Sequence, residues 1–275
     1  MASTQLDFEK FLVTEYFKHG SINKVYSTHH YNLPISFAGY HRVLTKFGVI
    51  KSAGPNSHLS ESLRILAKLA TYKIPLEKAY HQYAPSSIKV STNTLHRILH
   101  YIRLGLTRRQ GTALLITQVG KPDAFLTGVE THRPNSALGQ RGDLALPMGH
   151  SKTGEDPKDA IARVLQQEVF TDLVTNSMFP WEIIPSHPKP VLFINIADIK
   201  VAIYHLELPA IFQFSSFKLS QLQYRDLKEI SKHSLRPGIE EICQKYLTQG
   251  FDLKSPVIPE FISGLNLALA KVKTQ

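Results

Sequence analysis

The segment from Gly149 to Asp172 holds the side chains of this chain that are most capable of chemistry. If the helix in this segment continues past Phe170, Asp172 lies four residues after Glu168 on the same helix face. Glu155, on the loop before that helix, could then complete a group of three carboxylates, and carboxylate oxygens are ligands that Mg²⁺ prefers. The alternative is that these acids are solvated charges on a helix surface. The spacing alone leaves both interpretations open.

The same segment resembles the Nudix box, a motif that reads Gly, five residues, Glu, seven residues, Arg-Glu, an aliphatic residue, any residue, Glu-Glu, any residue, Gly and an aliphatic residue. The positions that match, with both spacings intact, are Gly149, Glu155, Arg163, Leu165 and Glu168. Residues 146–149, Leu-Pro-Met-Gly, are also similar to the Leu-Pro-Gly-Gly sequence that precedes the box in the family. Against the motif, Val164 and Gln167 stand for glutamates, Phe170 for the glycine and Thr171 for the closing aliphatic residue.

The resemblance implies a magnesium site on the helix face at positions 164, 167 and 168, and hydrolysis of nucleoside diphosphates linked to another moiety. Val164, Gln167 and Glu168 supply one carboxylate in place of three, and neither valine nor a neutral amide is a good ligand for a hard cation. Hydrolysis by the family's usual mechanism is therefore not expected. If activity remains, the resemblance assigns catalysis to Glu168, Glu155 and Arg163, and a displaced Mg²⁺ to Glu168, Glu155 and Asp172.

A ligand pocket is implied as well. Gly149 and His150 at the turn before the helix would contact a nucleotide-like small molecule, and Arg133 and Arg141 on the loop facing the box would hold its phosphates. The resemblance extends over residues 111–250, for which it implies an α/β/α sandwich with a mixed sheet. Strand-like runs at residues 113–117, 124–129, 191–196 and 201–208 agree with it. Residues 222–227 would form a closing loop and residues 237–247 a helix, with a helical tail over residues 251–275.

The net charge of the chain is confined to its N-terminal part. Residues 1–110 contain 15 basic and five acidic residues, which accounts for the whole formal charge of +10, and they also hold eight of the 13 histidines. Such asymmetry favours a polyanion partner for this part. The alternative is a solvated basic surface with no partner.

A weak internal repeat organises the same part. Residues 35–44 align without gaps with residues 90–99, and each copy contains a His-Arg pair, His41-Arg42 and His96-Arg97. Apolar spacing and capping residues predict helices at 6–17, 21–26 and 36–46 in the first copy, and at 63–72, 76–83 and 91–103 in the second. Residues 49–59 suit a small hairpin. This order resembles two winged helix-turn-helix units in tandem, the first over about residues 1–60 and the second over about residues 61–110.

That resemblance implies binding of duplex DNA, because a helix that begins with small polar residues can offer its first turn to base edges while basic side chains hold phosphates. The residues implied in DNA binding are Ser36, His41, Arg42, Lys46, Lys51, Thr92, Asn93, His96, Arg97, Arg103, Arg108 and Arg109. The alternative is that these helices only pack together or form a homodimer, with His41 and His96 facing inward.

Other features exclude some classes. No apolar run approaches the length of a membrane span and residues 1–10 are too polar for a secretory signal, so no membrane partner and a cytoplasmic location are expected. The single cysteine, Cys243, lies in the apolar pattern of a helix and is expected to be a buried thiol.

The sequence as a whole predicts an α+β protein: an N-terminal all-α tandem winged helix-turn-helix region, then a Nudix-like α/β/α sandwich with a mixed sheet. Two functions compete. In the first, a DNA-binding transcriptional regulator senses a nucleotide-type ligand through a degenerate Nudix-like domain. In the second, a Mg²⁺-dependent Nudix hydrolase uses a displaced metal site, and its basic extension serves targeting or assembly.

Overall fold

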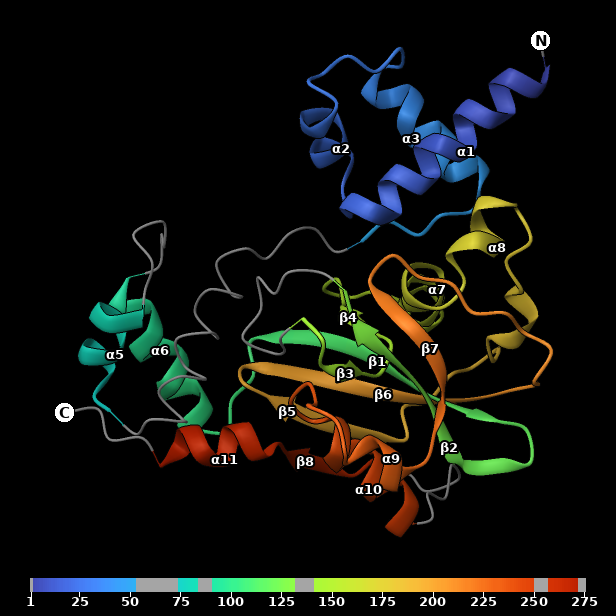
Figure 1. The fold of residues 1–275 in the computed structure, drawn as a ribbon. Helices are drawn as coiled ribbons and strands as arrows, with labels where there is room; N and C mark the ends of the chain where they lie inside the picture. Colours follow the sequence, from blue (N-terminus) through green and yellow to red (C-terminus); the bar gives the residue numbers. More distant parts are fainter. Residues whose placement is uncertain (1, 53–73, 84–90, 132–140, 250–256, 272–275) are drawn as a thin grey trace.

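A mixed eight-stranded sheet forms the centre of the molecule, with helices on both of its faces (Figure 1). The computed structural model describes residues 2–52, 74–83, 91–131, 141–249 and 257–271. The main path of the sheet runs β3-β2-β1-β6-β5-β8, with β4 paired to β1 and β7 paired to β2. The β1–β6 and β5–β8 pairs are parallel and the others are antiparallel. The strands are β1 (Arg109–Gln118), β2 (Lys121–Glu130), β3 (Leu144–Ala145), β4 (Met148–His150), β5 (Leu192–Ile196), β6 (Ile199–Leu208), β7 (Leu219–Arg225) and β8 (Glu260–Ile262).

The central strand β1 is buried on both faces because helices cover both sides of the sheet. Leu114 and Ile116 contribute to one apolar cluster together with the box helix, whereas Ala113 and Leu115 contribute to a second cluster on the other face. The predicted strands at 113–117, 124–129, 191–196 and 201–208 are confirmed within a few residues.

The helix of the box, α7 (Pro157–Glu168), starts where local chemistry predicts. The Asp156 side chain accepts a hydrogen bond from the Lys158 N–H and caps the helix, and Pro157 fits its first turn. The helix does not continue past Phe170: it ends at Glu168, and a separate short helix, α8 (Thr171–Thr175), follows. Phe170 instead forms a bridge to Ser215. Asp172 therefore does not follow Glu168 on one continuous helix face.

The first N-terminal unit consists of α1 (Ala2–His19), α2 (Ile22–Thr28) and α3 (Phe37–Lys46). Ser21 and Ser36 cap α2 and α3 as predicted, and Gly20, at φ 74°, ends α1. The apolar residues of the unit share one core with α7 and α8, so the unit lies on the face of the sheet that carries the box helix (Figure 1).

The second unit contributes α5 (Leu76–Tyr83) and α6 (Thr92–Arg103), as predicted, with Ser91 as the cap of α6. The buried side chains of α6 belong to the other apolar cluster, with residues of β5 and of α11 (Gly264–Ala270). In Figure 1, α5 and α6 lie beside α11 and far from α1–α3. The predicted helix at 63–72 lies outside the described residues.

Some expectations differ from the structure. The winged form of the N-terminal units is not shown: residues 49–52, the described part of the expected hairpin, form no strand. The stretch expected as a closing loop, residues 222–227, lies mostly in β7, because β2 offers it an edge to pair with. The tail contains β8 before its helix, since β5 offers a second free edge. Helices α9 (Leu227–Ile230) and α10 (Ile239–Gln249) lie on the face opposite α7. The 3₁₀ turn η1 (Trp181–Ile183) packs in the same apolar cluster as α7 and α8. Among the described helices, none combines the length and apolarity required to span a bilayer.

Candidate functional site

Two of the matching box residues are paired with each other. The Arg163 Nε and Nη2 atoms donate to Glu155 Oε1 and Oε2 at 2.8 and 2.9 Å, and the side chains are only 3% and 4% exposed. Burial acts to raise the pKa of the Glu155 carboxyl, but the hydrogen bonds and charge of Arg163 outweigh it and lower that pKa. A Cβ atom at Gly149 would lie 3.1 Å from Arg163 Nη1, so any larger residue there would press on the guanidinium. These residues hold the loop before α7 against the helix.

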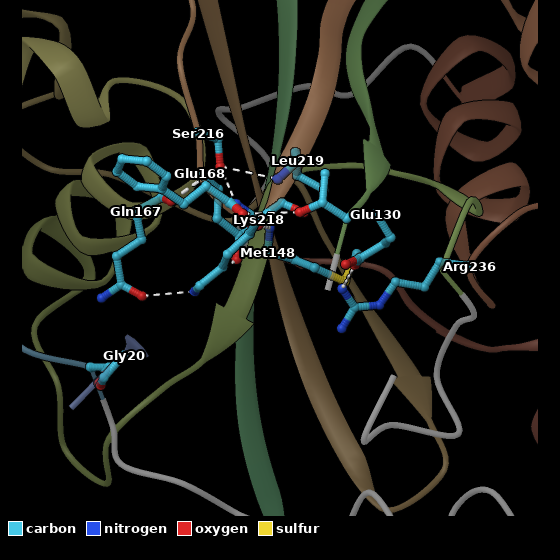
Figure 2. A network of polar contacts seen from close by, with 12 residues as sticks. Gly20, Glu130, Met148, Gln167, Glu168, Ser216, Lys218, Leu219 and Arg236 are labelled. Atoms are coloured by element: carbon cyan, nitrogen blue, oxygen red, sulfur yellow. Dashed lines mark hydrogen bonds and ion pairs between the residues drawn. The ribbon is translucent and has the colours of Figure 1, made fainter. Parts of the chain in front are cut away.

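A lysine contacts the last turn of α7 (Figure 2). Lys218 Nζ donates to Gln167 Oε1 at 2.9 Å and to Glu168 Oε1 at 3.3 Å. The other Glu168 oxygen, Oε2, accepts from the backbone N–H of Met148 at 2.8 Å. Val164 packs into the apolar core, while the Gln167 Nε2 donor is buried without a partner.

A second ion pair lies near Glu168 and Lys218. Arg236 Nη1 donates to Glu130 Oε1 at 2.8 Å, with both side chains mostly buried. Burial raises the pKa of the Glu130 carboxyl and the nearby charge of Glu168 adds to this effect, whereas Arg236 and Lys218 oppose it. The carboxylates of Glu130 and Glu168 and the cations of Lys218 and Arg236 therefore lie near one another, although they come from four separate segments of the chain.

His150 lies at the edge of this group. Burial lowers the pKa of its imidazole to about 4, and the positive charges of Arg109, Arg236 and Arg163 act in the same direction. His150 is therefore a neutral donor or acceptor at neutral pH. Arg141 is exposed, and Arg133 lies outside the described residues.

The arrangement of these side chains does not fit a magnesium ion. Within the described ranges no three His, Cys, Asp or Glu side chains lie close enough to share a metal, so Glu155, Glu168 and Asp172 are not brought together. Glu155 is paired with Arg163, and Glu168 uses one oxygen for a backbone N–H and the other for an ammonium group. Asp172 is exposed on α8. Magnesium binding stays a prediction of the resemblance.

The residues implied in DNA binding lie on two separate units. On the first, His41, Arg42, Lys46 and Lys51 are exposed, while the Ser36 hydroxyl caps α3 by accepting from the Gly39 N–H at 3.1 Å. Lys51 Nζ lies 3.2 Å from His41 Nδ1, and Lys46 forms an ion pair with Glu9. Neither His41 nor His96 is buried in the core.

On the second unit, Asn93, Arg97, Arg103 and Arg108 are exposed, and Thr92 and His96 are half-buried. His96 Nε2 lies 2.6 Å from Glu77 Oε1. Arg109 belongs to β1, and its guanidinium donates to the buried Asp198 carboxylate at 2.5 Å, a partner that leaves it less suited to contact phosphate. The two sets are not gathered on one surface.

Sequence reasoning missed Lys218, Glu130 and Arg236. Glu130 ends β2, Lys218 directly precedes β7 and Arg236 lies in the loop before α10, with no motif around any of them. Their relation to Glu168 depends on the tertiary structure. Glu130 closes a predicted strand next to the loop assigned to the pocket, which was the one local signal available.

Solved structures of Nudix hydrolases resemble about half of this chain. A Nudix hydrolase from Nitrosomonas europaea is 12% identical, with a TM-score of 0.39, over 57% of this chain and 78% of its own. The MutT protein from Methanosarcina mazei is 14% identical, with a TM-score of 0.38, over 54% of this chain and 98% of its own. An ADP-ribose pyrophosphatase from Streptococcus suis is 13% identical, with a TM-score of 0.37, over 57% and 99%.

No family model matches the chain, and no curated protein matches it. At the identities and TM-scores of the solved structures, the likeness assigns no activity to this chain. A Nudix-like interpretation therefore depends on residues of the chain itself: the box helix, its Glu155–Arg163 pair and the mixed sheet that carries them.

Proposed function

We propose that this chain is a DNA-binding transcriptional regulator whose degenerate Nudix-like domain binds a nucleotide-type ligand, linked through a diphosphate, with little or no hydrolysis. The observation that carries the proposal is the position of α7, which lies between Lys218 and the first N-terminal unit. On one side of this helix Gln167 and Glu168 bind Lys218, and the other side packs against the first N-terminal unit.

Gln166 makes the link between pocket and N-terminal unit specific. Its fully buried side chain accepts from the Ile50 N–H at 2.8 Å and donates to the Gly48 carbonyl at 2.9 Å. Both partners come directly after α3, the helix with the exposed basic residues. A ligand that moves the end of α7 would therefore act on α3, and a regulator needs a ligand that favours one arrangement over another.

The charge distribution supports DNA as the partner. All of the formal charge of +10 is carried by residues 1–110, and α3 presents His41 and Arg42 to solvent beside Lys46 and Lys51. Phosphate contacts of this kind give affinity that depends strongly on salt.

A second function rests on a different observation. Glu130 lies close enough to Glu168 to feel its charge and has a raised pKa, which is a property of carboxyl groups that transfer protons in hydrolases. In this alternative, a Nudix-type hydrolase would act on a nucleoside diphosphate substrate with Glu130 and Glu168 as its proton-transferring carboxyl groups.

The full chain should be titrated onto a labelled mixed-sequence DNA duplex and followed by fluorescence anisotropy at increasing salt, with and without ADP-ribose. We expect binding that weakens steeply as salt rises and an affinity that ADP-ribose changes. Lack of DNA binding at low salt would contradict the regulator. Mg²⁺-stimulated cleavage of ADP-ribose that is lost in Glu168→Gln would establish the hydrolase instead.

A further inference from the structure

Lys218 lies against the face of α7 where the Nudix motif would bind its metal ion. In the motif that face carries three glutamates at positions 164, 167 and 168, and here the side chains at 167 and 168 both point an oxygen at one ammonium group, at 2.9 and 3.3 Å (Figure 2). A lysine ammonium is a compact cation with three donors. It satisfies an amide and one carboxylate, a donor set that is too poor for Mg²⁺.

The segment around Lys218 is held in place by its own contacts. The Ser216 hydroxyl donates to the Gln167 carbonyl and accepts from the backbone N–H groups of Lys218 and Leu219 at 3.0 and 3.1 Å. The Lys18 ammonium of α1 lies over the Phe217 ring, 5.6 Å from the ring centroid. The lysine is thus positioned by the end of α7 and by the start of β7, next to the first N-terminal unit.

Among the described residues, Lys218 and Arg236 both keep N–H donors that could serve a ligand. Lys218 uses two of its three N–H groups on Gln167 and Glu168, and its side chain remains 31% exposed. Arg236 uses one nitrogen on Glu130. The remaining donors suit phosphate oxygens, which accept charge-assisted hydrogen bonds from lysine and arginine.

We propose that Lys218 takes the place of the divalent cation on this face of α7, so that a phosphate-bearing anion binds to Lys218 and Arg236 without any metal ion. This inference rests on the proposed ligand-binding role of the same domain. It adds that the cation that neutralises the ligand's phosphates is part of the chain, and that the ligand competes with Glu168 and Glu130 for these two side chains.

Metal-free binding is the first test. Inorganic pyrophosphate and ADP should be titrated into the full chain by calorimetry in excess EDTA and again in Mg²⁺. We expect binding in EDTA that Mg²⁺ does not strengthen. Lys218→Met should weaken it roughly ten- to a hundredfold, the loss expected for one charge-assisted hydrogen bond, while Lys218→Arg should retain most of it.

Two further variants control for folding. Lys200→Met removes another ion-paired lysine of similar exposure, 35% against 31%, and should bind pyrophosphate like the wild type. Lys218→Met combined with Glu168→Gln removes both partners of the ion pair, so no buried carboxylate is left uncompensated, and this double variant should fold and still bind pyrophosphate at least about tenfold more weakly than the wild type. Binding that requires Mg²⁺, or that keeps wild-type affinity in the double variant, overturns the proposal.

Direct metal binding is the second test, with Mn²⁺ as the probe and electron paramagnetic resonance as the readout. The wild-type chain should leave Mn²⁺ free in solution, and so should Gln167→Glu, in which Lys218 faces both carboxylates. Gln167→Glu with Lys218→Met should bind one Mn²⁺. A wild-type chain that binds Mn²⁺ and loses it in Glu168→Gln would show that the lysine does not replace the metal.

These outcomes are separate from those of the proposed function. Pyrophosphate binding in EDTA that leaves DNA affinity unchanged would refute the regulator and keep the role of Lys218. DNA binding that responds to ADP-ribose only in the presence of Mg²⁺ would keep the regulator and refute the role of Lys218.

Discussion

The two N-terminal units begin their exposed helices in the same way and pack in different places. Ser36 and Ser91 adopt nearly the same backbone angles, φ −78° with ψ 159° and 156°, and each hydroxyl accepts from the N–H three residues later. Yet α3 packs in the cluster that contains the box helix, and α6 packs in the cluster that contains α11 and β5. Short-range sequence similarity therefore decides how a helix starts, whereas the apolar side chains around it decide where it docks.

The difference also separates what each unit can sense. The first unit is hydrogen-bonded to α7 through Gln166 and touches the Lys218 segment through Lys18 and Phe217. The second unit packs on the face that carries α9, α10 and α11. If a ligand bound at Lys218 regulates DNA binding, we expect DNA contacts of the first unit to respond to it more than those of the second.

The largest effects should come from cavities in the two cores. Leu44 and Leu99 are both fully buried, so Leu44→Ala and Leu99→Ala should each lower the free energy of unfolding by about 2–5 kcal/mol. Urea denaturation, followed by circular dichroism and by the fluorescence of Trp181, which lies against Gly48, should show one shared transition. A loss below about 1 kcal/mol in either variant would contradict the packing of that unit.

The link between α7 and the first unit should have the next largest effect. Gln166→Ala leaves the Ile50 N–H and the Gly48 carbonyl without their partner, which should cost about 1–3 kcal/mol in urea denaturation. Gln244→Ala, on the exposed face of α10, is the matched control and should cost little. In anisotropy titrations, Gln166→Ala should also make DNA affinity insensitive to ADP-ribose. If ADP-ribose still changed the DNA affinity of Gln166→Ala, Gln166 would not be the link between the ligand and the first unit.

The helix caps should contribute less, and equally in both units. Ser36→Ala and Ser91→Ala should each cost about 1 kcal/mol, while replacement by glycine should cost a few tenths. Thermal unfolding of the four variants measures this. If the two alanine variants lost clearly different amounts of stability, the two caps would be alike in geometry but not in their contribution to stability.

Acid should affect the first unit more than the second. Glu15 is buried and contacts Lys18 and His29, while Glu77 is exposed and contacts His96. Burial acts to raise the pKa of the Glu15 carboxyl, but its partners lower it overall, and the His96 hydrogen bond lowers the pKa of Glu77. A depressed carboxyl pKa gives stability above its unfolded value that is lost as pH falls through the folded one, here from about pH 4.5 downward.

Glu15→Gln should therefore flatten the acid limb of the stability curve, measured by thermal unfolding between neutral pH and this range. Glu77→Gln, in the exposed pair, should change it little. Equal flattening by the two variants would argue against a buried role for Glu15.

The smallest effect on stability should come from the exposed arginines, which instead report DNA contacts. Arg42→Gln and Arg97→Gln should change the free energy of unfolding by less than about 0.5 kcal/mol. A variant that removes a phosphate contact should reduce the slope of log affinity against log salt by about 1. Anisotropy titrations would show whether one unit or both bind DNA.

Sequence patterns located the elements that local chemistry defines. The caps Ser21, Ser36 and Ser91 and the helices that follow them are confirmed, because a capping hydroxyl and an apolar period act over a few residues. Strands β7 and β8 were missed because each forms on an edge offered by a distant strand. The metal group of Glu155, Glu168 and Asp172 was not assembled, since α7 ends at Glu168 and Arg163 takes Glu155.

The sequence by itself determined that the segment from Gly149 to Phe170 keeps the spacing of the Nudix motif and carries Val164 and Gln167 at two of its three glutamate positions, because that information lies in residue identity and short spacing. Only the tertiary structure decided which side chain contacts Gln167 and Glu168. Lys218 reaches Glu168 from 50 residues away, and Gln166 reaches Gly48 across 118 residues. Contacts over such separations depend on how the strands pair and on which face each helix covers, and no local pattern encodes either.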